Sequence, residues 1–543
     1  MARAPLLVPA LAFVGAIICD AHGYVVVALG GAVVAALLPR GRVLAAFLIA
    51  GACCGALRGH PPLIRSESRV AMIAGTVIGD GGGASFTFAL DDGRIVRASV
   101  GSMVVPGERL LVRARLVPFD EPRNPGEPSA RAIGAAEGLA GKAIGVVVAR
   151  RPADPLDART WAARLRGALS ARLRAVLREP EATVVAGALW GERGTLPATL
   201  RDDFQATGTV HVLVTAGLHL GVIAALVLSL LRLAGVPRVA ASLTAIVCIV
   251  SYAWLTGAHL PAQRAAVMIG VALLARACGA RIASWNALAL AALVVAALWP
   301  AAATSVSFAL SFSCVAAIVL FARPLEHALE RLPVPARVRE ALSLTVATQI
   351  GVWPLTAATF GMVAPYAVLA NALVVPATAV AMLGGVATLL VAAVPVLANA
   401  CSAVTAFDVD VALGVVQFVA SLPGARLSVA PPPPVAIVAY DLVALAAAAL
   451  LSRAPRLACV LLALASASVM TTTLRLPDGH LTITMLDVGQ GDAIVLRTPR
   501  GHTILIDSGG RLEQGPDVGG RSPAEVVGER IVLGYLRREG IHT

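Results

Sequence analysis

Hydrophobic and polar positions divide the chain into long apolar stretches and two segments that alternate with the period of a β-strand. Apolar runs at 6–19, 25–38 and 43–57 open the chain. Each run is shorter than the roughly 20 residues that cross a bilayer, so flanking residues must complete the span. No clear cleavage site follows the first run. We therefore predict N-terminal transmembrane helices within residues 1–59, with the first helix retained.

Residues 60–155 are polar and predict a small β-barrel. Glycine and proline turns separate short runs in which apolar and polar residues alternate. Five short strands in such a segment are typical of an OB-like barrel. Phe86 and Phe88 share one strand face, where they are either barrel core or a platform on which bases stack. The predicted strands are 70–78, 85–90, 94–100, 109–117 and 143–149.

Residues 156–210 begin with an amphipathic helix at about 158–178 and continue as a linker. Arginines crowd the surface that its leucines leave free. This pattern is typical of a helix in the membrane interface, and a helix that faces nucleic acid is the alternative. The apolar ridge consists of Leu165, Leu169, Leu173 and Leu177.

Residues 211–472 are almost continuously apolar and predict a polytopic helical domain. Residues 395–434 contain Asp408, Asp410 and a run of prolines, which indicate an interfacial helix and a turn. The predicted spans are 212–231, 239–256, 261–276, 284–299, 305–322, 340–357, 361–376, 377–394, 435–452 and 455–472.

Composition supports the membrane assignment. The chain has 543 residues, of which 58% are apolar and 14% are charged, whereas about a quarter of the residues in soluble domains are charged. One globular core cannot bury so many apolar residues, so lipid must solvate the remainder. The net charge of +12 is almost wholly arginine, and it fits nucleic acid, anionic lipid or cytoplasmic-loop bias equally well. The eight cysteines lie in or beside apolar stretches and indicate neither disulfides nor a metal site.

Arginine placement orients the predicted helices. If the N-terminus is cytoplasmic, arginines occupy alternate, cytoplasmic connections and the 60–155 barrel lies outside the cell membrane. The C-terminal segment lies on the same side as the barrel if 361–394 crosses twice. It lies in the cytoplasm if that stretch is a single broken span. The arginines concerned are Arg3, Arg40, Arg42, Arg232, Arg238, Arg276, Arg281, Arg323, Arg331, Arg337, Arg339, Arg453 and Arg456.

Polar side chains within the apolar part are candidates for a polar path. Burying an ionised group in hydrocarbon costs at least about 2.5–3.5 kcal/mol, so such groups line a cavity or pair with one another. Gly208 and Gly217 near two of them suggest a close backbone approach or a broken helix. The candidates are Glu192, Arg193, His211, His219, Arg264, Gln349 and Asn371.

Each candidate also has an ordinary structural interpretation. Glu192 and Arg193 would pair at the membrane surface, either histidine would be a packing residue, and Arg264 would extend toward water. His211 and His219 are eight residues apart without a carboxylate at the spacing of a metal site.

Residues 480–543 return to the alternation of β-strands. A strand runs into a turn that contains glycines, and a later strand ends in an aspartate beside two glycines. Such an arrangement holds loops around a polar site or is an ordinary strand–turn–strand unit. The residues are Asp487, Gly489, Gln490, Gly491, Asp492, Asp507, Gly509 and Gly510.

These motifs, in this order, resemble the ComEC family of competence DNA-uptake channels over nearly the whole chain. The C-terminal turns resemble the start of that family's metallo-β-lactamase-like domain, and the 60–155 segment its OB-like external domain. Two positions differ from the family, with Ala216 in place of serine and Ala309 in place of glutamine. The matching residues are Gly191-Glu192-Arg193, Phe204, Gly208, His211, Gly217-Leu218-His219, Gly257, Pro261, Arg264-Ala265, Asn286, Phe308, Phe312, Asn371, Pro376 and Asn124-Pro125-Gly126.

The resemblance implies an inner-membrane channel of a bacterial cell that passes single-stranded DNA into the cytoplasm. Its expected partners are DNA and membrane lipid. Contacts with a DNA receptor and a cytoplasmic motor, and assembly of several copies, stay open. No nucleotide-binding loop is evident, so an ATP-driven motor would be another protein.

The implied fold is a polytopic α-helical membrane protein with an OB-like barrel and an incomplete α/β metallo-β-lactamase-like C-terminus. Metal hydrolysis in that fold needs a His-x-His-x-Asp-His run, and none of the nine histidines lies in one. We therefore expect no catalytic residue, metal or cofactor in this chain, although a complete homologue would bind divalent metal. By resemblance, Asp507 would organise loops rather than bind metal. Truncation or a split gene is the expected explanation for the missing His-x-His-x-Asp-His run and the incomplete domain.

Two other functions fit the same residues. A secondary transporter of a small solute would use broken helices and midplane polar groups equally, although no internal repeat is evident in 212–472. A membrane hydrolase acting on envelope material would use Glu192, His211 and His219 for acid–base work, but we identify neither a nucleophile nor a metal for it.

Overall fold

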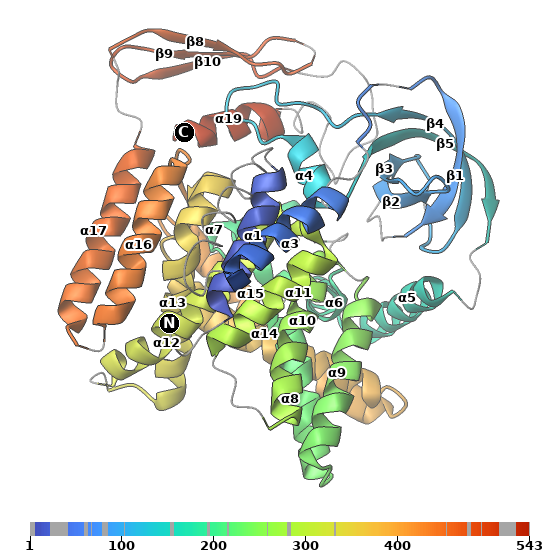
Figure 1. The fold of residues 1–543 in the computed structure, drawn as a ribbon. Coiled ribbons are helices and arrows are strands. Elements are labelled where there is room, and N and C mark those ends of the chain that lie inside the picture. The colour runs from blue at the N-terminus through green and yellow to red at the C-terminus, as the bar shows by residue number, and fades with distance from the viewer. Residues whose placement is uncertain are drawn as a thin grey trace.

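The helices pack as one bundle, and a small barrel and a three-stranded sheet lie at the same end of it (Figure 1). We call this end the barrel end. The computed structural model describes the chain except for residues 1–5, 22–41, 59–62, 67, 79–84, 103, 153–156, 193–195, 214–216, 258, 280–283, 331–332, 452, 475–478, 490, 510–527 and 542–543.

Two N-terminal helices, α1 (Leu7–Ala21) and α3 (Arg42–Arg58), pack against each other. A glycine permits the close approach, because an ideal Cβ at Gly51 would lie 2.4 Å from the carbonyl oxygen of Phe13. The Leu6 N–H donates to Asn286 Oδ1 at 3.3 Å, which ties this pair to α11 (Ser284–Leu298). The predicted span at 25–38 lies outside the described residues.

The five predicted strands close into a barrel in the order β1-β2-β3-β5-β4, which confirms the OB-like prediction. All pairings are antiparallel except that between β3 and β5. The elements are β1 (Ala71–Val77), β2 (Ser85–Leu90), β3 (Ile95–Ser99), β4 (Arg109–Val117), α4 (Ala130–Ala136) and β5 (Gly141–Arg151).

Phe86 and Phe88 belong to the barrel core. Their exposed fractions are 2% and 0%, and their ring centroids lie 5.8 Å apart with the rings edge to face. Alternate residues of β2 point inward, so both phenylalanines meet the other apolar side chains that fill the barrel. The stacking-platform interpretation is therefore wrong for these residues.

Helix α5 (Ala158–Val176) packs on protein with part of its leucine ridge. Leu173 and Leu177 are buried in the core that surrounds α6 (Glu181–Trp190). Arg166 is also buried, and its Nη1 donates to the carbonyl oxygen of Leu255 at 2.5 Å. The other face is exposed and carries Trp161. An interfacial position for that face stays a prediction.

The chain is a multi-pass membrane protein. Seven described helices, α9, α10, α12, α13, α14, α15 and α17, are long and apolar enough to cross a membrane. The elements of this part are α7 (Ala198–Ala206), η1 (Val210–Leu213), α8 (Gly217–Leu233), α9 (Arg238–Leu255), α10 (Leu260–Ala277), η2 (Pro300–Thr304), α12 (Val306–Leu329), α13 (Ala336–Phe360), α14 (Ala367–Leu390), α15 (Pro395–Ser421), α16 (Pro434–Leu450) and α17 (Pro455–Thr473).

The predicted division of residues 361–434 is wrong. One continuous helix, α14, replaces the two spans predicted in 361–394, because Pro376 does not break it. Membrane helices tolerate proline where neighbouring groups satisfy the freed backbone. The expected interfacial helix and turn is instead α15, a helix of 27 residues that is apolar despite Asp408 and Asp410.

The α14–α15 hairpin returns to the end of the bundle where it began. Strand β6 (Met362–Val363) precedes α14 and pairs with β7 (Leu427–Ser428), which follows α15. The pairing holds the two outer ends of the hairpin together. Both helices are long and apolar enough to cross a membrane, so a hairpin that crosses and returns would leave the chain after α15 on the side predicted for a double crossing.

The C-terminal sheet lies over the barrel end. Its antiparallel order is β10-β9-β8, and a π-helical turn, η3, and a short helix, α19, pack on one face (Figure 1). The predicted strand–turn–strand pattern is thus present. The elements are β8 (Thr482–Met485), β9 (Ile494–Arg497), β10 (Thr503–Ile506), η3 (Gly528–Leu533) and α19 (Gly534–Arg538).

Candidate polar path and C-terminal loops

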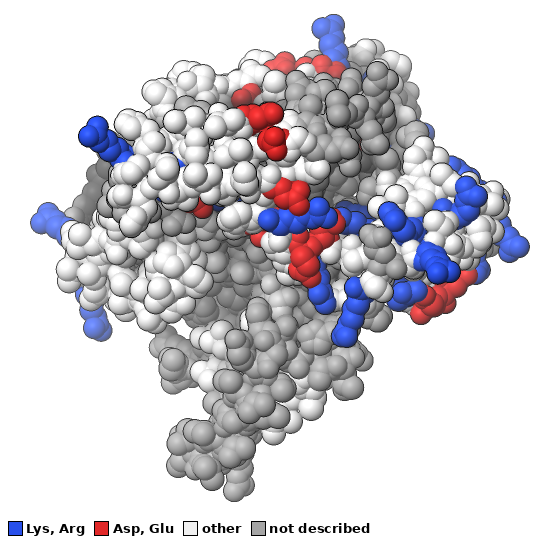
Figure 2. Space-filling model, turned by 90° about the horizontal axis from the view of Figure 1, so that it is seen from above, with Lys and Arg blue, Asp and Glu red and all other residues white. Residues whose placement is uncertain are grey.

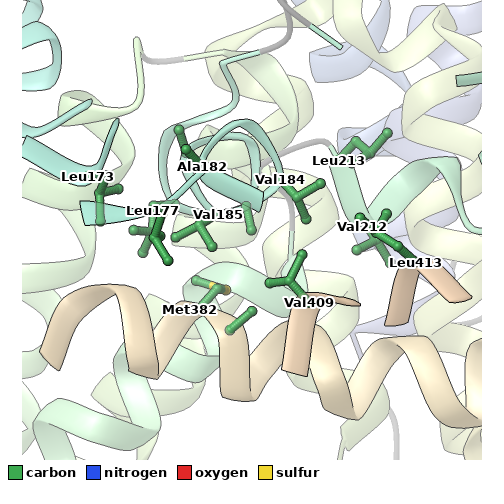
Figure 3. Close-up of a cluster of buried hydrophobic side chains, with 14 of the residues drawn as sticks. Leu173, Leu177, Ala182, Val184, Val185, Val212, Leu213, Met382, Val409 and Leu413 are labelled. Carbon is green, nitrogen blue, oxygen red and sulfur yellow. The ribbon is translucent and has the colours of Figure 1, made fainter. Parts of the chain in front are cut away.

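Helix α6 is buried on all sides and carries the first motif at its end. Figure 3 shows Val184 and Val185 of this helix close to Met382 of α14 and Val409 of α15. Every residue of α6 from 182 to 190 is buried. The helix ends at Gly191, whose φ of 76° is the left-handed conformation of a C-cap. This packing fixes where the next residue, Glu192, emerges.

Glu192 joins α6 to α5. Its Oε2 accepts from Ser170 Oγ at 2.6 Å and its Oε1 from Arg174 at 2.5 Å, while Trp190 Nε1 donates to Ser170 Oγ at 2.8 Å. Burial alone would raise the pKa of Glu192, but the hydrogen bonds from Ser170 and Arg174 outweigh it and leave the pKa lowered. The partner of Glu192 is thus 18 residues before it. Arg193, the partner expected from sequence, lies outside the described residues.

The lowered pKa of Glu192 predicts a pH-dependent contribution to stability. The contribution is fully present above the ordinary value of 4.5 and is lost as the pH falls through the lower pKa of the folded state. Glu192→Gln should lower the free energy of unfolding by about 1–3 kcal/mol at pH 7. The difference from the unmodified protein should shrink as the pH falls below 4.5. Thermal unfolding of the purified protein in detergent across this range measures it.

A surface pair provides the control for this experiment. Glu121 bonds Arg131 at 2.9 Å where both side chains are exposed, so Glu121→Gln should change the free energy of unfolding by less than about 1 kcal/mol. If the Glu192→Gln protein were as stable as the unmodified one at pH 7, the bonds of Glu192 would not contribute to folding.

The two histidines occupy different environments. His219 is fully buried, and its Nε2 lies 3.1 Å from the carbonyl oxygen of Val212, so it ties the start of α8 to η1. His211 lies exposed on η1. Together with the bonds of Glu192, this bond of His219 to main chain disfavours the acid–base roles that a hydrolase would need.

Of the two glycines expected to permit close approach, Gly208 does so and Gly217 does not. An ideal Cβ at Gly208, whose φ is 69°, would lie 3.0 Å from Ala367 Cβ at the start of α14. At Gly217 it would meet nothing within 4 Å. The turn before η1 is therefore seated against α14.

Arg264 is the most deeply buried charged side chain among the described residues. It is 1% exposed on α10, and its Nη2 donates to Ser307 Oγ at 2.6 Å, to the Ser307 carbonyl oxygen at 3.1 Å and to Ser311 Oγ at 3.2 Å. Its Nε and Nη1 are buried without a hydrogen-bond partner, and among the described residues no carboxylate pairs with it. Arg264 therefore points between helices and does not extend toward water.

Sequence reasoning missed the two serines that hold Arg264. They lie 43 and 47 residues after it, on α12. Ser311 is part of the Phe308–Phe312 motif, and Ser307 lies four residues earlier on the same helical face. The spacing of Ser307 and Ser311, four residues apart, was the one sequence signal that could have indicated a polar helix face opposite Arg264.

Asn371 and Gln349 have surroundings different from those of Arg264. Asn371 of α14 is 7% exposed, and its Oδ1 is buried without a hydrogen-bond partner. Gln349 of α13 lines a mostly apolar cavity of about 390 Å³, together with Tyr440 and Ser466. His219, Arg264 and Asn371 all lie within the first two turns of helices that begin at the barrel end.

Comparison with known proteins assigns this helical part. The sequence model of the Competence protein family matches residues 189–454. Residues 189–454 therefore form a Competence domain of the ComEC type. All the candidate path residues fall within the domain.

Two known proteins are similar to parts of this chain, and the match to the first is longer than the Competence domain. ComE operon protein 3 of Bacillus subtilis (strain 168) is 25% identical over 381 residues, which cover 67% of this chain and 47% of the relative. The uncharacterized protein YcaI of Escherichia coli (strain K12) is 29% identical over 169 residues, covering 29% and 22%. The chain thus matches at most about half the length of these relatives. No solved structure matches the chain.

After the Competence domain, two glycine-containing loops of the C-terminal sheet pass against each other. Asp487 Oδ1 accepts from the Gly489 N–H at 3.0 Å, and Asp507 Oδ1 accepts from the N–H groups of Ser508 and Gly509 at 2.6 and 3.2 Å. An ideal Cβ at Gly509 would lie 2.5 Å from Val488 Cγ2. Both aspartates therefore shape their loops.

The remaining residues of this motif differ in what the structure describes. Gly491 has a φ of 81° and Asp492 is exposed, while Gln490 and Gly510 lie outside the described residues. Within the described part of the chain, no group of three or more His, Cys, Asp or Glu residues could hold a metal ion.

Proposed function

We propose that this chain takes part in DNA uptake, and that its Competence domain forms the membrane passage for single-stranded DNA. The proposal rests on the match to the Competence protein family and on one observation, the unpaired buried guanidinium of Arg264. Single-stranded DNA carries one negative charge per nucleotide and needs positively charged groups along any route through lipid.

The energetics of Arg264 favour a ligand with negatively charged oxygens. A buried cation without a counter-charge loses hydration that two serine hydroxyls replace only in part. Its Nε and Nη1 groups, which have no hydrogen-bond partner, can each donate a charge-assisted hydrogen bond to a phosphate oxygen. A phosphate that passes this point would therefore receive hydrogen bonds that no described residue accepts.

The surface of the barrel supports the same proposal. Seen from above in Figure 2, Lys and Arg side chains gather over the barrel. On β4, the exposed Arg113 has Met72 and Val146 as cross-strand neighbours, both exposed. Because the phenylalanines are buried, we propose that the barrel holds a strand through arginine–phosphate contacts rather than through stacking.

The proposed orientation follows the arginines. The α8–α9, α12–α13 and α16–α17 connections carry Arg232, Arg238, Arg337, Arg453 and Arg456 and lie away from the barrel end. We propose that this far end faces the cytoplasm of a bacterial cell and that the barrel and C-terminal sheet lie outside its inner membrane. DNA receptors, a motor and further copies of the chain remain proposed partners.

Transport of a small solute is the second candidate. The cavity of about 390 Å³ beside Gln349 favours it, because its size suits a small molecule and its lining is mostly apolar. This cavity contains neither Arg264 nor Asn371, so Gln349 is the one candidate path residue that the two proposals share.

Deletion of the gene in its native host tests the leading proposal. Labelled double-stranded DNA should still bind the cell surface, but its nuclease-protected internal fraction should fall to background. A plasmid copy of the gene should restore it. Unchanged transformation would contradict the DNA proposal and leave the solute transporter.

A further inference from the structure

The barrel and the C-terminal sheet meet through one asparagine side chain. Asn124 follows β4, is 6% exposed, and bonds the main chain of Asp487 with both ends of its amide. The Asp487 N–H donates to Asn124 Oδ1 at 2.8 Å, and Asn124 Nδ2 donates to the Asp487 carbonyl oxygen at 3.1 Å. The side chain thus replaces the donor and acceptor that a neighbouring strand would offer, across 363 residues of sequence.

The turn that carries Asn124 is built to hold it in place. Glu127 Oε2 accepts from the N–H groups of Arg123 and Asn124 at 3.0 and 3.1 Å. Gly126 adopts a φ of 69°, and the side chain of Arg538 from α19 lies 3.6 Å from the position of its ideal Cβ. The turn is therefore fixed from within and covered from the C-terminal side.

A second contact acts on the side chain of Asp487. Arg123 Nη1 lies 3.3 Å from Asp487 Oδ2, while the other carboxylate oxygen accepts from Gly489. Both polar main-chain groups of Asp487 and both of its carboxylate oxygens are thus engaged. Next to it, the buried Val488 packs against Gly509 of the second loop.

We propose that the Asn124-Pro125-Gly126 turn is the docking site for the C-terminal domain, and that Asn124 positions the Asp487 and Asp507 loops over the barrel end. The two soluble parts then move as one body on the Competence domain. Asparagine suits this role because one planar group supplies a donor and an acceptor. Aspartate would place a second acceptor against the Asp487 carbonyl oxygen, and alanine would supply neither group.

Hydrogen exchange of the full chain in lipid nanodiscs tests the proposal. In the unmodified protein, peptides that contain Asp487 should exchange slowly, because Asn124 accepts from its N–H. Asn124→Ala and Asn124→Asp should each speed exchange there at least tenfold while leaving the barrel strands protected. Arg131→Ala, which removes a surface ion pair in the same domain without touching the sheet, should change nothing at Asp487.

Arg123→Glu keeps the test decisive if the Asn124 variants fail to fold. The Arg123 side chain is 62% exposed, so its replacement should leave the barrel intact but set a carboxylate against Asp487. Faster exchange at Asp487 and Gly489 is the expected result. Unchanged exchange in Arg123→Glu, or in a folded Asn124→Ala protein, would overturn the proposed docking of the C-terminal domain on this turn. None of these outcomes depends on whether the chain transports DNA.

Discussion

Replacing Arg264 with glutamine should reduce DNA internalisation at least tenfold and leave DNA binding at the cell surface unchanged. Glutamine removes the positive charge that we propose meets each passing phosphate, but it retains a polar side chain at the position between α10 and α12. A tenfold loss corresponds to about 1.4 kcal/mol of barrier height, which is modest for a charge-assisted contact away from water. Nuclease-protected uptake of labelled DNA, normalised to the amount of chain in the membrane, measures the effect.

Stability separates this role from a structural one. Removing an unpaired buried charge should leave the unfolding temperature of the purified protein unchanged or raise it, whereas loss of a needed structural contact would lower it. Arg264→Lys, which keeps the charge without the planar guanidinium, should internalise DNA at an intermediate rate. Arg232→Gln, at an exposed position in the last turn of α8, should behave like the unmodified protein. Normal uptake in the Arg264→Gln protein would exclude Arg264 from the path.

The barrel shows which parts of the fold local sequence patterns can predict. Inward and outward residues alternate along each strand, and turn residues mark the boundaries, so the strands appear close to their predicted bounds. β5 runs over Gly141–Arg151 and extends the predicted 143–149 at both ends. The same alternation shows that Phe86 and Phe88 face one side, but only the closed barrel shows that this side is the core.

The helical part shows where such patterns fail. A continuous apolar run with Pro376 inside it is compatible with one helix or with two, because hydropathy does not record where a chain reverses. In the structure, α14 runs through Pro376 without a break. The β6–β7 pairing, which joins Met362 to Ser428 and Val363 to Leu427, shows that the chain reverses after α14 and not within it. Two aspartates at 408 and 410 suggested a surface segment, yet they belong to a long apolar helix.

The candidate site was predictable as a set of residues but not as a set of contacts. Sequence alone singled out Glu192, His219, Arg264 and Asn371, since polar groups in an apolar stretch require an explanation. Their partners come from tertiary structure. Glu192 bonds α5 rather than the adjacent Arg193, and Arg264 bonds α12. The resemblance also singled out Asn124, but no local pattern indicates that its partner is Asp487.

Leucine at Gly384 should destabilise the Competence domain, with a loss of about 1–3 kcal/mol or more in the free energy of unfolding. Gly384 is where α14 and α15 touch, since its ideal Cβ would lie 2.3 Å from Thr405 Oγ1 and 3.2 Å from Thr405 Cβ. Thr405 is 1% exposed and bonds the Cys401 carbonyl oxygen, so it has little room to move. A larger side chain must push the two helices apart, and small residues are what permits such helices to approach closely in membranes.

Gly414 of α15 provides a matched control for this substitution. It is exposed, and an ideal Cβ there would meet nothing within 4 Å. Gly414→Leu should therefore leave stability unchanged or raise it slightly, because leucine favours a helix over glycine. Thermal unfolding followed by intrinsic tryptophan fluorescence, in the same detergent for both variants, compares them. Equal unfolding temperatures would mean that the two helices do not meet closely at Gly384.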